Sequence, residues 1–129
     1  MSSDAENRRY TRVSVSIPAK LSVLIPEETF QPVTYDCKVL DISERGAMMQ
    51  VQIEPETYSL MMRKTRYCRM DFSEIEGLPD KVTGKAVWLQ PQGNNENGRF
   101  YRIGLFFEDC PAENVSKLRK YVDSIKSQM

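Results

Sequence analysis

Residues 13–25 read VSVSIPAKLSVLI, and apolar side chains alternate with small or polar ones through this segment. Val13, Val15 and Ile17 share one face, and the two serines between them share the other. Beyond Pro18 the alternation continues to the end of the segment. A period of two over this length predicts a half-buried β-strand, with Pro18 marking a bulge or an edge.

The same period recurs along most of the chain. Further strands are predicted at residues 30–42, 47–53, 66–72, 82–89 and 99–107. Turn-forming residues separate them, and QPQGNNENG at 90–98 has the composition of a polar hairpin loop. The segment 54–65, EPETYSLMMRKT, has no clear period, and we expect a loop whose apolar anchor is Leu60, Met61 and Met62.

The end of the chain changes to a helical period. Pro111 occupies the position of a first helical turn, where its missing N–H has no cost. One apolar stripe then recurs at spacings of three and four residues: Val115, Leu118, Val122 and Ile125. This pattern predicts an amphipathic helix at residues 111–126 that packs on the domain's own sheet.

These elements define an all-β fold class, a six-stranded antiparallel β-barrel with a C-terminal α-helix. The 129 residues suit one domain, with a flexible tail at residues 1–7 and the barrel with its helix at 8–129.

Composition narrows the functional classes. The formal net charge is zero, so the chain as a whole lacks the basic field typical of nucleic-acid binders. The absence of histidine removes the common nucleophilic triads, histidine general bases and most catalytic zinc sites. Catalysis by carboxylates alone stays open, so an enzymatic function is weakened rather than excluded. We expect a non-enzymatic protein without a metal or a cofactor.

The cysteines and the apolar runs indicate the compartment. Cys37, Cys68 and Cys110 are too few and too widely spaced for a disulfide framework, and we expect buried or half-buried thiols. No secretory signal stands at the start, and the apolar runs are far shorter than the roughly 20 residues that span a bilayer. A soluble, cytoplasmic protein without membrane insertion is expected.

Two short motifs carry functional chemistry. RRYTR at residues 8–12 is a basic cluster, and arginine pairs bidentately with phosphate and with the O6 and N7 acceptors of guanine. In DISERG at 41–46, Asp41 and Ser43 can cap their own backbone, and Gly46 supplies a positive φ or a close backbone approach. An aspartate also accepts hydrogen bonds from guanine N1–H and the N2 amine. Together the motifs suit a ligand that contains both guanine and phosphate.

The pairing of RRYTR before the first strand with DISERG after the second resembles the PilZ domain family. Its pattern is R-x-x-x-R, often with an adjacent arginine, followed about thirty residues later by [D/N]-x-S-x-x-G. Both motifs are present without departure, and the strand containing Trp88, the closing strand RIGLFFED and the terminal helix are laid out as in that family.

The resemblance implies a barrel that binds the bacterial second messenger cyclic di-GMP (c-di-GMP) and catalyses nothing. The ligand-binding residues that it implies are Arg8, Arg9, Arg12, Asp41, Ser43, Gly46 and Trp88. The arginines would clamp phosphates and guanine edges, Asp41 would accept the guanine N–H groups, Ser43 would assist, and Gly46 would permit close approach. For Trp88 a ligand contact and packing within the barrel remain equally open.

A mechanism follows from this inventory. Ligand binding would order the polar N-terminal arm and change a surface read by a protein partner, in control of motility, biofilm formation or a related behaviour. The partner's identity is open, and we expect a monomer or weak dimer. One ligand is slightly favoured over a stacked pair, for which Arg45 is the available extra guanidinium.

Two other functions stay open at this point. A PilZ-like domain can act as an adaptor by protein–protein interaction without ligand. A small barrel can also bind single-stranded nucleic acid on aromatic platforms, here Tyr10, Trp88, Phe100 and Tyr101. The zero net charge weighs against nucleic acid, as does the strand position of Phe100 and Tyr101, where one of the two normally points inward.

Overall fold

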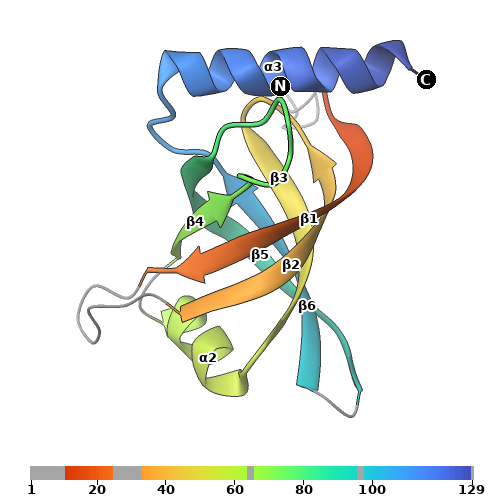
Figure 1. Cartoon of the computed structure of the whole chain (residues 1–129). Coiled ribbons are helices and arrows are strands. Elements are labelled where there is room, and N and C mark those ends of the chain that lie inside the picture. Colours follow the sequence, from red (N-terminus) through yellow and green to blue (C-terminus); the bar gives the residue numbers. More distant parts are fainter. Residues whose placement is uncertain (1–10, 25–32, 64–65, 96–97, 129) are drawn as a thin grey trace, which may run out of the picture.

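The computed structural model describes residues 11–24, 33–63, 66–95 and 98–128, which form a closed barrel with α3 across one end and α2 near the other (Figure 1). The elements are β1 (Val13–Val23), β2 (Val33–Ile42), β3 (Gly46–Ile53), α2 (Pro55–Arg63), β4 (Tyr67–Asp71), β5 (Lys81–Asn95), β6 (Gly98–Phe106) and α3 (Ala112–Ser127). The predicted tail at 1–7 lies outside the described residues, as do Arg8, Arg9 and Tyr10.

The strands form a ring in the order β1-β2-β3-β6-β5-β4, and every neighbouring pair is antiparallel. Pairing of β1 with β4 closes the ring. The predicted all-β, six-stranded antiparallel barrel with a C-terminal helix is confirmed. Closure removes the exposed strand edges that an open sheet of this size would present.

The alternation in β1 positions its side chains as predicted. Ile17, Leu21 and Val23 are buried, while Val15 is only half-buried. The register against β2 shifts between Ser14 and Ile17, so the bulge lies just before Pro18. Beta4 pairs with β1 only from Lys20 to Val23, so the proline precedes the part of β1 that β4 covers. Both features that Pro18 predicted are therefore present at this end of the strand.

Inward side chains from all six strands fill the barrel. The largest fully buried side chains are Tyr101, Phe72, Phe107, Leu21, Ile42, Met49, Met61, Met70, Ile103, Leu118, Val23 and Val39. Burial of this apolar area is the main term that stabilises the fold. Cys37 and Cys68 are buried among these residues and burial raises the pKa of each thiol to about 12, while Cys110 is half-buried.

The predicted loop at 54–65 is wrong, because α2 runs from Pro55 to Arg63. Proline suits the first helical position, and the Tyr58 N–H donates to the Glu54 carbonyl at 3.1 Å. Thr57 and Met61, four residues apart, are buried on one face. The predicted anchor was only partly right, since Met61 is buried, Leu60 half-buried and Met62 47% exposed.

Two contacts hold α2 on the barrel. The hydroxyls of Tyr35 in β2 and Thr57 lie 2.6 Å apart. The Tyr58 ring stacks on Tyr101 of β6, with 4.4 Å between the ring centroids. Tyr101 is therefore buried inside the fold, which removes one of the aromatic platforms that the nucleic-acid alternative required.

The predicted hairpin loop at 90–98 is also wrong in extent. Beta5 continues to Asn95 and β6 begins at Gly98, so the two strands extend as a paired ribbon at the end of the barrel opposite α3 (Figure 1). The register shifts between Pro91 and Gly93, and Gly93 has a φ of +142°. Residues 90–95 thus belong to a paired strand with a bulge rather than to a loop, and residues 96–97 lie outside the described residues.

The terminal helix packs on the barrel as predicted. It begins at Ala112, one residue later than expected, with Pro111 as its N-cap residue. Leu118 and Val122 are buried in the same core cluster as the barrel interior. Val115 and Ile125, at the margins of the predicted stripe, are half-buried.

The position of α2 predicts a sharp difference between neighbouring methionines. Met61→Ala should lower the free energy of unfolding by about 2–5 kcal/mol, because it leaves a cavity under the helix. Met62→Ala is the control and should change it by less than about 0.5 kcal/mol, since that side chain is largely exposed. Urea denaturation measures both, and equal losses in the two variants would contradict the orientation of α2.

Candidate ligand-binding site

Five residues, one from each of the adjacent strands β1, β2, β3, β6 and β5, form a row on the outer face of the barrel. Ser14 pairs with Asp41, Asp41 with Met48, Met48 with Gly104, and Gly104 with Trp88. Directly paired residues of neighbouring strands project from the same face of a sheet. We call these five residues the Asp41–Trp88 row. The barrel thus places two predicted site residues that are far apart in the sequence, Asp41 and Trp88, on one row, with β3 and β6 between their strands.

Two β-bulges turn Asp41 and Trp88 of this row outward. Val39 is buried, and strict alternation would also direct Asp41 inward. The register shift between Val39 and Asp41 inserts one extra residue, so Asp41 faces outward and Ile42 is buried instead. Beta5 has a second shift between Ala86 and Trp88, with the same effect on the tryptophan.

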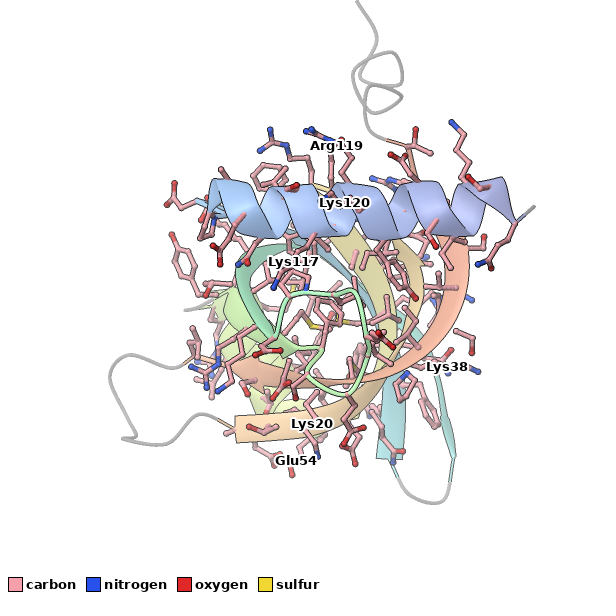
Figure 2. The ribbon with its side chains drawn as sticks, turned by 45° about the horizontal axis from the view of Figure 1, so that its top comes forward. Lys20, Lys38, Glu54, Lys117, Arg119 and Lys120 are labelled. Carbon is pink, nitrogen blue, oxygen red and sulfur yellow. The ribbon has the colours of Figure 1, made fainter. Side chains whose placement is uncertain are left out.

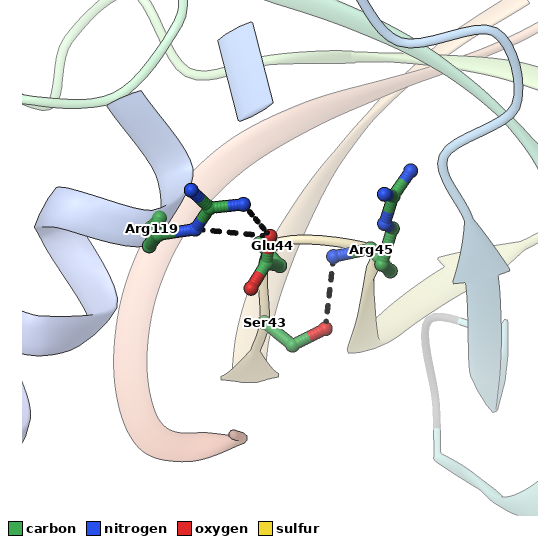
Figure 3. A network of polar contacts seen from close by, with 4 residues as sticks. All are labelled: Ser43, Glu44, Arg45 and Arg119. Atoms are coloured by element: carbon green, nitrogen blue, oxygen red, sulfur yellow. Dashed lines mark hydrogen bonds and ion pairs between the residues drawn. The ribbon is translucent and has the colours of Figure 1, made fainter. Parts of the chain in front are cut away.

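The DISERG turn is organised by the Ser43 hydroxyl (Figure 3). Ser43 is buried, and its Oγ accepts hydrogen bonds from the N–H groups of Arg45 and Gly46, each at 3.1 Å. The Ser43 N–H donates to the Gly46 carbonyl at 2.8 Å. Ser43 therefore acts on the backbone of the turn, and its side chain is occupied there.

Gly46 allows a close backbone approach rather than a positive φ. A Cβ at this position would collide with the carbonyl oxygen of Leu105 in β6. The Phe107 N–H also donates to the Arg45 carbonyl at 2.8 Å. The glycine thus lets β3 begin directly against β6, which seats the turn on the barrel.

Asp41 is a half-buried carboxylate beside a cation. Burial raises its pKa, and the positive charge of Arg12 and a backbone hydrogen bond from Met48 partly offset that effect. Arg12 immediately precedes β1, whose Ser14 pairs with Asp41. The anion is thus less well stabilised than in water, and further N–H donors would favour it.

Trp88 both packs on the barrel and remains partly open. A Cβ on Gly104 would collide with the indole, so the ring covers the backbone of β6 at that glycine. The residue is still 40% exposed. The packing interpretation is supported, and a ligand contact through the open part of the ring stays a prediction.

Sequence reasoning missed Arg102. It pairs with Gln50 on one side and Gln90 on the other, two residues before Gly104 on the outer face of β6. Its Nε is buried and has no hydrogen-bond partner among the described residues. Its alternation with buried Tyr101 and Ile103 is the signal that would have predicted an outward cation beside the row.

An ion pair between Glu44 and Arg119 was also missed (Figure 3). Arg119 of α3 donates to Glu44 Oε2 from Nε at 3.2 Å and from Nη2 at 2.7 Å. The Glu44 side chain is only 17% exposed. The turn is thus tied to the terminal helix by residues 75 positions apart, a separation over which no sequence pattern indicates contact.

The predicted residues fall into three groups. Arg12, Asp41, Ser43 and Gly46 lie together where β1, β2 and β3 meet, and Trp88 lies on the same row. Arg8 and Arg9 lie outside the described residues. Within residues 11–24, 33–63, 66–95 and 98–128 no cluster of three or more metal-ligating side chains occurs. No helix in these ranges is long and apolar enough to cross a membrane.

Solved structures share this fold. The PilZ domain of YcgR from Escherichia coli, with c-di-GMP, is similar with a TM-score of 0.66 and 11% identity, covering 94% of this chain and 92% of that one. PlzA from Borreliella burgdorferi, in complex with c-di-GMP, gives 0.57 and 14%, covering 96% and 55%. The Bacillus subtilis inhibitor of motility, MotI (DgrA), gives 0.59 and 12%, covering 94% and 51%. The chain thus spans about half the length of the latter two proteins.

The sequence itself gives the family. No curated protein sequence matches the chain significantly. The family model of the PilZ domain matches residues 6–124, which include both motifs, the whole barrel and most of α3. The chain belongs to the PilZ domain family.

Proposed function

We propose that this PilZ domain is a cytoplasmic, non-catalytic receptor for c-di-GMP. The observation that carries the proposal is the placement of Arg12 beside Asp41, at a complete DISERG turn. A cation and an outward carboxylate at one point provide both kinds of group that a guanine nucleotide requires.

Arg12, the last residue of the RRYTR motif, directly precedes β1. Val13 pairs with Ile42, so Arg12 stands at the edge of the DISERG turn. Arg8 and Arg9 precede it by a few residues in the same motif. In this proposal the arm folds over the ligand with its arginines on the phosphates, and each charge-assisted hydrogen bond contributes about 1.5–3 kcal/mol.

The outer face of the barrel would receive a guanine. Asp41 accepts from the N1–H and the N2 amine, and Gly46 and Ser43 hold the turn in the geometry that presents it. The open part of the Trp88 ring offers an apolar surface at the other end of the row. Arg102 adds a second cation between these two residues, on the adjacent register position.

Structural relatives favour the same ligand and a role in signalling. YcgR and PlzA carry c-di-GMP in their structures, and MotI is described as an inhibitor of motility. We propose that ligand binding orders the arm over the barrel and changes a partner-facing surface, in the control of motility, biofilm formation or a related behaviour. Ordering residues has an entropic cost of about 1–2 kcal/mol each, so several arginine bonds must form together.

Substitutions at the arm and the turn test the assignment. Arg12→Ala and Asp41→Ala should each weaken c-di-GMP binding about tenfold or more, because each removes a charged hydrogen-bonding group. Asp36→Ala is the matched control, since this aspartate lies on the same strand with its side chain 88% exposed. Isothermal titration calorimetry gives affinity and stoichiometry, and unchanged affinity in both site variants would refute the proposed contacts.

Binding should also depend on pH through Asp41. Because burial raises the pKa of this carboxyl, it takes up a proton at a higher pH than an exposed aspartate. Affinity should therefore fall as the pH drops through that raised value, with proton release on binding. The same shift means that the ionised form weakens the fold, so stability is greatest below the ordinary aspartate pKa and declines as pH rises through the raised one.

Asp41→Asn separates these two effects. It should lose the pH dependence and most of the affinity while keeping or raising the free energy of unfolding at pH 7. Calorimetry in buffers of different ionisation enthalpy measures the released proton. A wild-type affinity that stays constant across the acid range would argue against Asp41 as the acceptor.

Ser43 should act through the turn. Ser43→Ala leaves two part-buried N–H groups without their acceptor, which should cost up to about 1–3 kcal/mol of stability. Its loss of ligand affinity should accompany disorder of the turn, seen as faster amide exchange at Arg45 and Gly46. A Ser43→Ala protein with wild-type stability and lost binding would instead assign Ser43 a direct ligand contact.

A further inference from the structure

A groove of about 420 Å³ lies between α3 and the loop that joins β4 to β5. Gly77 and Leu78 line it from the loop, and Lys117, Lys120, Tyr121 and Ser124 line it from the helix. The helical residues are spaced at three and four positions, so they form one continuous edge along the groove. The groove belongs to no part of the Asp41–Trp88 row.

Two apolar side chains that pack on the core form the base of this groove. Gly77 has a φ of +92°, a conformation that favours glycine, and a Cβ there would lie 3.5 Å from Cδ1 of the Tyr121 ring. Leu78 is buried, and Tyr121 is half-buried against the core. The base of the groove is therefore apolar and already formed, which lowers the ordering cost of binding.

The helical edge of the groove is basic. Lys117 and Lys120 are exposed and have no ion pair among the described residues, and Figure 2 shows both on α3, with Lys117 beside the loop. Arg119 is on the other flank of the helix, where it pairs with Glu44. Glu76 adds one carboxylate on the loop side. Two unpaired lysines above an apolar base favour an occupant that is both acidic and apolar.

We infer that this groove binds an acidic segment of a partner protein. An apolar side chain of that segment packs on Leu78 and Tyr121, and its carboxylates pair with Lys117 and Lys120. A membrane surface fits less well. A helix that lies on a bilayer exposes large apolar side chains, and the large exposed apolar residues of the described chain are all outside α3: Met62, Tyr67, Val87, Trp88 and Phe106.

The test uses the whole chain and a defined probe. The acidic peptide EDLEELDE is titrated into ¹⁵N-labelled protein, with the peptide EDSEESDE and phosphatidylserine vesicles in parallel. Amide shifts should concentrate at residues 76–78 and 117–124, and EDLEELDE should bind more tightly than its serine counterpart. Shifts located elsewhere, or binding to vesicles but not to peptide, would overturn the inference.

Charge reversal gives the decisive comparison. Lys117→Glu combined with Lys120→Glu should weaken peptide binding about fivefold or more, and raised salt should weaken wild-type binding. Lys38→Glu, an exposed lysine of β2 away from α3 in Figure 2, is the matched control and should leave it unchanged. Equal affinities in the double variant and the wild type would reject the groove.

Two further measurements keep the outcome clear. If charge reversal disturbs the fold, Lys117→Gln combined with Lys120→Gln replaces it, and a loss of peptide affinity is still required. The double variant should retain wild-type affinity for c-di-GMP by calorimetry. The inference therefore fails or stands independently of the proposed ligand function.

Discussion

The buried Ser43 hydroxyl is the constraint on which the site depends. It accepts two backbone N–H groups and thereby fixes the turn between β2 and β3. From that turn Gly46 leads β3 directly against β6, and the Arg45 carbonyl accepts from Phe107. A buried hydroxyl with satisfied partners gives a rigid turn, whereas the same N–H groups without an acceptor would be costly. The fixed turn in this way also holds the backbone of Asp41, two residues earlier, in place.

The two β-bulges determine which side chains of β2 and β5 lie on the outer face of the barrel. A barrel without them would direct Asp41 and Trp88 into the core, because each follows a buried residue by two positions. One extra residue before each side chain reverses its direction without changing the pairing further along the strands. The outer row is therefore a product of irregular pairing, and the closed ring supplies the rigid support on which these two irregularities are tolerated.

Much of this structure follows from periodicity, and its exceptions have physical reasons. The strands and α3 are long or regular enough for their period to be read from the chain. Helix α2 is too short for its period to be recognised, because only Thr57 and Met61 are buried. The burial of Thr57 depends on its contact with Tyr35 of β2, which the sequence does not reveal. Residues 90–95 are of turn-forming types, but pairing with β6 holds them as a strand.

The candidate site also contains residues that the sequence predicts and residues that only the structure reveals. The motif residues Arg12, Asp41, Ser43 and Gly46 were predicted as a group, and they lie together. That Ser43 is occupied by the turn could not be read from the motif, because a serine serves a backbone or a ligand equally well in sequence. The position of Arg102 beside the row could be recognised only from the register of β6 against its neighbours.

Helix α3 connects the turn to the opposite flank of the molecule. On one side of the helix, Arg119 forms an ion pair with Glu44 of the DISERG turn. On the other side, Lys117 and Lys120 border the groove. If ligand binding shifted the turn, the Glu44–Arg119 contact would be the route by which that shift reached the groove edge. Coupling between two binding sites is reciprocal, so in that case the ligand and an acidic segment in the groove would change each other's affinity by the same factor. The ion pair is largely exposed on its arginine side, and so it is the part of this connection most readily broken by salt.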